Sequence, residues 1–471
     1  MSTGRETKVV VIGLDCAAPQ LVFDQYRGRL PNLERLMARG VSGRLRSCDP
    51  PITVPAWSVM LSSKDPGTLG IYGFRNRCDY SYDKMAFATG AAVREPRVWD
   101  YLGRAGKRVI LLGIPGTYPP RPVNGCMVSC FLTPSIESNY TYPAELKEEI
   151  ARLVHPYMVD CPDFRTDNKQ RLLDDIYRMT DKRFTLARHL LRTKPWDFFM
   201  MVEMGTDRIH HAFWKFMDPS HRQYQPGNPW EHAIRDYYDY VDDRIGQLLE
   251  AVPEDAVILV VSDHGAKAMD GGICINEWLI QQGYLVLKQY PSKPTRFAEL
   301  AVDWARTRAW SEGGYYARVF LNVQGREPQG TIPPAEYEAF RDTLARQIEA
   351  IPDENGRPIN TRVLKPQDLY RKVNGVAPDL FAYFGQLRWR SVGTVGLKTV
   401  QTLANDTGPD DANHAEEGIF ILAGPGIPAG RQWHDGQLMD VAPTVLKVFD
   451  MDIPADMQGK PFPAVLCESP A

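Results

Sequence analysis

Residues 256–265 read AVILVVSDHG, and this stretch is the strongest indication of the fold class. Its first part, AVILVV, is a continuous apolar run, which is typical of a strand buried on both faces of a parallel sheet. Asp263, His264 and Gly265 follow directly. In an open parallel sheet, ligands bind beyond the carboxyl ends of the strands. We therefore expect Asp263 and His264 to face a binding site at this edge, with metal ligation as the favoured role.

Apolar and amphipathic stretches alternate along the rest of the chain. Continuous apolar runs, typical of buried strands, occupy residues 8–14, 108–113, 197–203 and 418–422. Apolar residues at helical spacing occupy residues 31–38, 98–105, 230–252 and 441–448. Strands separated by helices form a parallel sheet that is covered on both faces. The expected fold is therefore α/β, with a mostly parallel sheet sandwiched by helices.

Residues 285–400 differ from the rest of the chain in composition. They are richer in proline, glycine, arginine and aromatic residues, and they contain one clear helical pattern at 334–351. A chain of 471 residues is long enough for a large α/β domain with an insertion. We expect residues 285–400 to form an inserted cap subdomain, and residues 1–284 and 401–471 to form the catalytic core.

The overall composition argues against two classes of partner. The chain has 55 basic and 58 acidic residues, so its net charge is −3 and gives no basic surface for a nucleic-acid polymer. No stretch approaches the roughly 18 to 20 apolar residues of a membrane span. The N-terminal MSTGRETK lacks the apolar core of a signal peptide. We expect a cytoplasmic protein, and its composition is compatible with a homo-oligomer.

The cysteines support the same compartment. They are scattered through a long chain, without the dense pairing of a secreted disulfide scaffold. We expect all of them to be thiols. They are Cys16, Cys48, Cys78, Cys126, Cys130, Cys161, Cys274 and Cys467.

Asp15 ends a second apolar segment, VVVIGLD at residues 9–15. It is expected at the same edge of the sheet as Asp263 and His264. A carboxylate there is well placed for a metal ion, but acidic residues after strands also cap the next helix. This segment alone leaves both roles open.

Thr53 lies within DPPITVPAWSVM at residues 49–60, before a helical pattern with Pro55 near its first turn. One role for this threonine is the helix N-cap. A helix N-terminus also presents unpaired N–H groups and a positive dipole end to a phosphate. A hydroxyl in that place becomes a nucleophile when a metal or a base activates it. Thr53 is therefore a candidate nucleophile.

Three further residues complete the set of candidate metal ligands. Asp207 and His211 are four residues apart, so one helical turn places both on the same face, within reach of one ion. An ordinary pair on a helix surface explains the spacing equally well. His210 lies about 100° around the helix, away from that face. His414 precedes the apolar run at 418–422. Such Asp and His clusters suit a pair of zinc or manganese ions.

The order of these motifs resembles the alkaline phosphatase superfamily, in particular its type I phosphodiesterase/nucleotide pyrophosphatase branch. Its bacterial and archaeal group of predicted phosphohydrolases and phosphomutases is the most similar. The matching segments are VVVIGLD, RLPNLERLMARGVSGRLRS, PPITVPAWSVMLSSKDPGTLGIYGF, GTDRIHHAFW, VSDHG, NHAEEGIFILAGPGI and DVAPTVL. They span nearly the whole chain in the family's order.

The resemblance implies a division of the ligands between two divalent metal ions. Asp207, His211 and His414 would hold one ion. The other ion would be bound by Asp15, Asp263 and His264, and it would also bind and activate Thr53. Two ions about 3.5 to 4 Å apart stabilise both the attacking and the leaving oxygen of an in-line displacement. The implied reaction is hydrolysis of a small phosphate ester through a phospho-threonine intermediate.

The chain departs from the nucleotide pyrophosphatases in its substrate contacts. Those enzymes carry an asparagine three residues after the nucleophile, where this chain has Ala56 followed by Trp57. Trp57 is expected to form an apolar rim that suits the second ester group of a phosphodiester. A phosphodiesterase is therefore the favoured activity. The candidates for the missing oxygen contact are Lys64, Arg75, Arg77 and Arg208.

The same residues bear on three other possible functions. A sulfatase needs a cysteine or serine in a C/S-x-P-x-R setting, which the segment at Thr53 does not supply. A phosphomonoesterase, or a phosphomutase acting on a sugar phosphate, remains open, because it needs the same metals and a hydroxyl nucleophile. A non-catalytic binding protein is a further alternative, but a decayed enzyme is expected to have lost some of these ligands.

Overall fold

A large mixed sheet forms the centre of the computed structural model, which describes residues 7–465. Its strand order is β20-β2-β19-β9-β1-β8-β5-β6-β7, and β21 also pairs with β2. The strands are β1 Val9–Leu14, β2 Gly40–Arg46, β5 Val109–Leu112, β6 Gly125–Val128, β7 Thr141–Tyr142, β8 Phe198–Glu203, β9 Val257–Val261, β19 Glu417–Ala423, β20 Arg431–Gln432 and β21 Gly436–Gln437.

Most of these strands run parallel, as the alternating pattern predicts. β1 lies between β8 and β9 and pairs in parallel with both, so Val11 faces Met200 on one side and Leu259 on the other. β19 is the main exception, because it is antiparallel to both β9 and β2. The reason is the path of the chain. It leaves the core through β10 (Gly265–Ala268) and returns through the antiparallel β18 (Ala412–Ala415), so β19 enters the sheet from the opposite end to β9.

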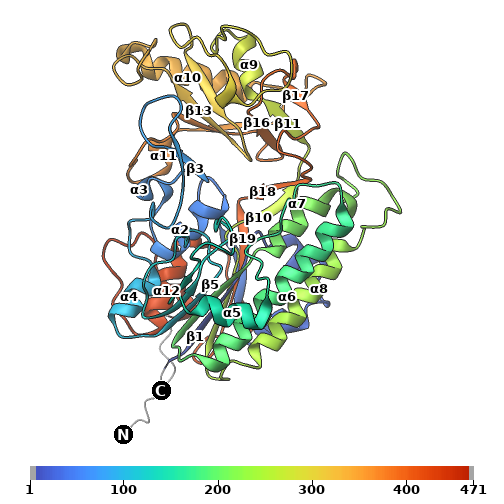
Figure 1. The fold of residues 1–471 in the computed structure, drawn as a ribbon, viewed down its shortest axis with the longest axis vertical. Coiled ribbons are helices and arrows are strands. Elements are labelled where there is room, and N and C mark those ends of the chain that lie inside the picture. The colour runs from blue at the N-terminus through green and yellow to red at the C-terminus, as the bar shows by residue number, and fades with distance from the viewer. Residues whose placement is uncertain (1–6, 466–471) are drawn as a thin grey trace.

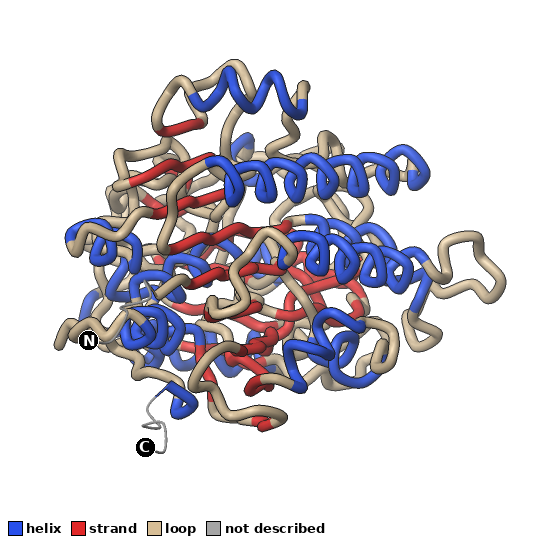
Figure 2. The backbone as a smooth tube through the Cα atoms, turned by 90° about the horizontal axis from the view of Figure 1, so that it is seen from below, coloured by secondary structure: helices blue, strands red, loops and turns tan. Residues whose placement is uncertain are grey.

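Helices cover both faces of this sheet. Figure 1 shows α6 and α8 on one side and α4 and α12 on the other, and Figure 2 places the strands between helices when the molecule is seen from below. The core helices are α1 Pro31–Ala38, α2 Thr53–Ser62, α3 Pro66–Leu69, α4 Val98–Arg104, α5 Leu146–Val154, α6 Lys169–Thr193, α7 Gly205–Met217, α8 Ala233–Leu249 and α12 Val441–Val448. α1 and α12 have the predicted bounds, whereas the long α6 was not predicted.

A second layer lies over the carboxyl edge of the sheet, at the top of Figure 1. It has its own hydrophobic core, with buried residues between Ile273 and Trp389, so it begins before residue 285. Its elements are β11 Gly271–Cys274, α9 Ile275–Gln281, β12 Ala309–Glu312, β13 Ala317–Leu321, α10 Tyr337–Glu349, β14 Arg362–Leu364, α11 Pro366–Leu369, β15 Leu380–Tyr383, β16 Trp389–Val392 and β17 Gln401–Thr402. We call this layer the cap.

The described residues also bear on the expectations from composition. The seven cysteines within this part of the chain are free thiols, and Cys467 lies outside it. Among the helices of residues 7–465, none is both long and apolar enough to cross a membrane.

Candidate two-metal site

The six predicted ligands meet beneath the cap. Asp15 follows β1, and Asp263 and His264 follow β9, so these side chains lie where two neighbouring parallel strands end. Asp207 and His211 occupy the first turns of α7, which starts just after β8. His414 is carried by β18, where it pairs with Ala266 of β10. All six ligands are at most 2% exposed.

The six side chains form two groups of three. Asp207, His211 and His414 make up the first group, and Asp15, Asp263 and His264 the second. Within each group, one ligand atom of every residue lies within 4.8 Å of the others. In the first group, Nε2 of His211 is 3.2 Å from Oδ1 of Asp207 and 3.3 Å from Nε2 of His414. In the second, Nε2 of His264 is 3.2 Å from Oδ2 of Asp263.

The three histidines turn the same nitrogen toward these groups. In each, Nδ1 lies against an oxygen acceptor: Asp410 at 2.7 Å for His211, the Gly265 carbonyl at 3.2 Å for His264, and the Pro51 carbonyl at 2.9 Å for His414. A carbonyl or carboxylate oxygen at Nδ1 leaves Nε2 as the ligating nitrogen, which is how metal-binding histidines are usually oriented.

The three aspartates are arranged in a matching way. Oδ2 of Asp15 accepts a hydrogen bond from Trp57, Oδ2 of Asp207 accepts one from Arg208, and Oδ1 of Asp263 accepts one from the Cys16 amide. The second oxygen of each carboxylate is buried and accepts no hydrogen bond from the described residues. A buried carboxylate oxygen without a hydrogen-bond partner costs free energy of desolvation, and a bound cation at each of these three atoms would offset that cost.

The electrostatics of the site also favour cations. Burial raises the pKa of Asp15 and of Asp263, and the charge of Asp207 or Asp15 nearby adds to the effect. Burial lowers the pKa of His264 to about 4, so its ring is neutral at pH 7 and free to bind a metal. Burial also lowers the pKa of His414, whereas the carboxylates of Asp410 and Asp207 raise the pKa of His211, so a metal ion would displace a proton from that ring. Imidazoles with buried carboxylates form a donor set that fits two divalent metal ions.

Thr53 lies beside the second group. It is the first residue of α2, and its Oγ1 is 3.4 Å from Nε2 of His264. The N-cap of α2 is Ile52, with no capping hydrogen bond from a side chain, so the hydroxyl of Thr53 does not cap the helix. The threonine therefore presents its hydroxyl to the metal ligands from a helix N-terminus.

A loop between α5 and α6 supports the first group, and the sequence did not point to it. Asp160 of this loop accepts two hydrogen bonds of 2.8 Å from Arg208, which in turn donates to the ligand Asp207. Arg165 of the same loop lies 3.2 Å from Asp410, the acceptor at Nδ1 of His211. Both protein ligands on α7 are thus oriented by charged partners from one loop.

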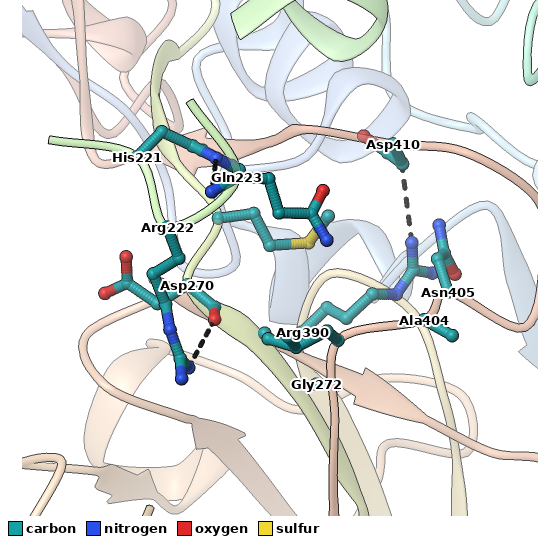
Figure 3. A pocket seen from close by; sticks show the side chains of 12 residues that line it. His221, Arg222, Gln223, Asp270, Gly272, Arg390, Ala404, Asn405 and Asp410 are labelled. Atoms are coloured by element: carbon teal, nitrogen blue, oxygen red, sulfur yellow. Dashed lines mark hydrogen bonds and ion pairs between the residues drawn. The ribbon is translucent and has the colours of Figure 1, made fainter. Parts of the chain in front are cut away.

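Asp410 was also missed, although it is the acidic residue that holds His211. Its second oxygen is 3.4 Å from Nη1 of the buried Arg390 on β16. Figure 3 shows this ion pair, with Arg390 extending along one wall of a small pocket toward Asp410. No short motif marks Asp410, because its partners are 20 to 245 residues away in the chain.

Two predicted substrate contacts have other positions in the structure. Trp57 is fully buried and its Nε1 lies 2.7 Å from Asp15, so it supports a metal ligand and does not form an exposed rim. Lys64 is also buried, and its ammonium lies 2.6 Å from the carboxylate of Asp456. Contacts with segments that are distant in the sequence bury both side chains, and their sequence neighbourhood did not reveal these contacts.

The three arginine candidates are all paired with acidic groups. Arg77 is buried against Glu327 of the cap at 3.3 Å and lies over the Trp310 ring. Arg75 is half exposed and is 3.9 Å from Glu312. Arg208 is the only one of the three that contacts a metal ligand, through Asp207. Substrate contact by Arg75 and by Arg208 stays a prediction, whereas the side chain of Arg77 is buried in an ion pair with the cap.

A mostly parallel α/β core with two buried Asp/His groups at the carboxyl edge of its sheet defines the alkaline-phosphatase-like class of folds. Within that class, the chain belongs to the type I phosphodiesterase / nucleotide pyrophosphatase family, whose model matches residues 9–410. A comparison of the sequence with curated proteins gives no match.

Several solved structures share this fold. Human ectonucleotide pyrophosphatase/phosphodiesterase 5 is 14% identical, covers 95% of this chain and 96% of its own, and has a TM-score of 0.53. An inactive threonine-to-alanine variant of the murine protein, in complex with AMP, is 13% identical over the same shares, with a TM-score of 0.56. Phosphonoacetate hydrolase from Sinorhizobium meliloti 1021, in complex with phosphonoformate, is 16% identical over 94% of this chain and 97% of its own, with a TM-score of 0.58.

Proposed function

We propose that the protein hydrolyses small phosphodiesters at a two-metal site, with Thr53 as the nucleophile. The observation that carries the proposal is the position of the Thr53 hydroxyl. It lies 3.4 Å from the ligating nitrogen of His264, at the N-terminus of α2. Backbone N–H groups and the positive dipole end of a helix at this point favour an anionic phosphoryl group.

The chain's own residues have clear parts in such a reaction. The Thr53 hydroxyl loses its proton and its oxygen attacks phosphorus, while the bond to the leaving ester oxygen breaks and that oxygen takes up a proton. The phosphoryl group, which still carries the second ester substituent, stays on Thr53 until water releases it. Two divalent ions, when bound, stabilise charge on the attacking and leaving oxygens. We propose zinc, with manganese as the alternative, because imidazole and carboxylate ligands suit both. Burial of the site keeps bulk water from competing with Thr53.

The charge balance around the site supports a diester. A monoester dianion usually calls for a free, bidentate arginine. Here the guanidinium of Arg208 is divided between Asp160 and Asp207, and Arg165 and Arg390 both pair with Asp410. These three arginines therefore have carboxylate partners already. A singly charged diester fits this balance better than a dianion does.

The AMP bound to one of the similar structures supports a small substrate. AMP occupies the inactive variant of the murine protein, and AMP is a small phosphate ester. We propose a substrate of this size, with its phosphorus atom bound between the two groups of metal-binding residues.

Turnover of two chromogenic esters tests the proposal. With zinc or manganese loaded to the same level, kcat/KM is expected to be higher for bis-p-nitrophenyl phosphate than for p-nitrophenyl phosphate. The matched pair shares one leaving group, so the comparison isolates the second ester substituent. A higher kcat/KM for the monoester would contradict the phosphodiesterase assignment and would favour a phosphomonoesterase or a phosphomutase.

A further inference from the structure

Tyr315 is a cap residue that reaches the metal ligands. It lies between β12 and β13, and it is 8% exposed. Its backbone carbonyl accepts a hydrogen bond of 3.0 Å from the side chain of Asn413, the residue before the ligand His414. The preceding Gly314 pairs with Ser391 through two backbone hydrogen bonds. The backbone of Tyr315 is therefore held from both the core and the cap.

The side chain of Tyr315 packs on the first group of ligands. Its ring stacks on the His414 ring, with centroids 4.2 Å apart, and on the His211 ring at 5.1 Å. Its hydroxyl is 3.3 Å from Nε2 of His211, the nitrogen that faces the ligand group. Arg165 donates a hydrogen bond of 2.7 Å to the same hydroxyl oxygen.

These contacts determine where the phenolic hydrogen can point. A guanidinium only donates, so the Tyr315 oxygen accepts from Arg165 and its own hydrogen needs another acceptor. The other nitrogen in reach of the hydroxyl, Nε2 of His211 at 3.3 Å, cannot accept a hydrogen bond while it binds a metal ion. The loaded site therefore leaves the phenol as a buried donor at the first group of ligands. An unsatisfied buried donor is unfavourable, so this place requires an oxygen acceptor.

We infer that Tyr315 donates a hydrogen bond to a phosphoryl oxygen of the substrate, and that it determines specificity from the cap. The inference rests on the proposed function and deepens it. A phenol is neutral at pH 7, and the charge of Arg165 behind it is balanced by Asp410. A neutral donor suits the single negative charge of a phosphodiester. Ala56, in the first turn of α2, has no side-chain donor for this oxygen.

Binding of inorganic phosphate to the metal-loaded protein tests this role without turnover. Tyr315→Phe removes the hydroxyl and keeps the ring that stacks on His414. Tyr316→Phe is the matched control, because the neighbouring hydroxyl donates to the carbonyl of Tyr72 instead. By calorimetry, we expect the Kd of phosphate to rise about tenfold to a hundredfold in Tyr315→Phe and to stay within twofold in Tyr316→Phe. Both variants are expected to hold two metal ions.

Each other result has a definite meaning. Phosphate binding of wild-type strength by fully loaded Tyr315→Phe would overturn the inference and leave the proposed function intact. Loss of one metal from Tyr315→Phe alone would also overturn it, since the tyrosine would then act on His211 and not on substrate. Failure of the loaded wild-type protein to bind phosphate and to hydrolyse either ester would overturn the inference together with the proposed function.

Discussion

Asp410 lies 2.7 Å from Nδ1 of His211, and both side chains are buried. The carboxylate fixes the ring so that Nε2 faces Asp207 and His414. It is itself held by two arginines, Arg165 at 3.2 Å and Arg390 at 3.4 Å. An acidic residue behind a ligating histidine raises the basicity of that ligand and fixes its tautomer. Asp410 is therefore a positioning residue for the first ligand group.

Asp410→Asn is expected to weaken binding of one of the two metal ions about tenfold to a hundredfold. The amide keeps the size of the carboxylate but removes the charge that Arg165, Arg390 and His211 share. Metal titration of the purified variant measures the loss. Asp411→Asn is the control, because the neighbouring carboxylate pairs with Lys215 at 3.2 Å. Equal metal affinity in Asp410→Asn and in wild type would show that Asp410 does not position His211 for metal binding.

Thr53→Ala is expected to abolish turnover and to leave the fold and the metal content nearly unchanged. The hydroxyl does not cap α2, so its loss should cost less than the roughly 1 kcal/mol typical of an N-cap. Ester hydrolysis and metal analysis are measured on the same sample. Ser58→Ala is a matched control on the same helix, where the hydroxyl bonds to the Val54 carbonyl. Activity of Thr53→Ala within tenfold of wild type would exclude Thr53 as the nucleophile.

Removal of the metal ions is expected to abolish ester hydrolysis and to lower the thermal stability of the protein. Three buried carboxylate oxygens, on Asp15, Asp207 and Asp263, then lack a cation. Free metal at about 1,000 times its Kd stabilises a protein by about 4 kcal/mol per site, so chelation should shift thermal unfolding by several degrees. Elemental analysis is expected to give two ions per chain. A single ion in a fully active sample would contradict the two-group arrangement.

The stability of the chelated protein is expected to decrease as the pH falls below 6.5, in part because of His221. Burial lowers the pKa of His221, and its Nδ1 accepts a hydrogen bond of 3.1 Å from the Gln223 amide. The folded state keeps this ring neutral, whereas the unfolded chain binds a proton below about pH 6.5. The stabilisation is therefore complete above that pH and is lost on acidification.

His221→Asn should flatten this dependence, because the asparagine oxygen can accept the same hydrogen bond and does not titrate. One proton changes the free energy of unfolding by at most about 1.4 kcal/mol per pH unit. Urea denaturation between pH 5 and 7, with chelator present, compares the two slopes. Identical slopes would show that His221 is protonated in the folded state as readily as in the unfolded one.

Local patterns predicted the elements of the core well. The helices at residues 31–38 and 441–448 have the expected bounds. The bounds of β1 and β9, the strands that precede Asp15 and Asp263, differ from the prediction by at most one residue. Apolar periodicity decides these elements, because it reports burial that neighbouring residues share. The 25-residue α6 was missed, since its many charged residues obscure the narrow apolar face.

The types of the candidate ligands, and the edge of the sheet at which they gather, can be predicted from the order of the residues alone, because residues that follow parallel strands must lie together. The identity of the residues that support these ligands depends on how distant segments pack together. Asp160, Arg165, Tyr315 and Asp410 come from separate segments and leave no local pattern. The sequence leaves Trp57 and Arg77 available for substrate contact, but packing places Trp57 behind Asp15 and Arg77 against the cap. Side-chain environments of this kind depend on contacts between distant segments, and no local spacing records them.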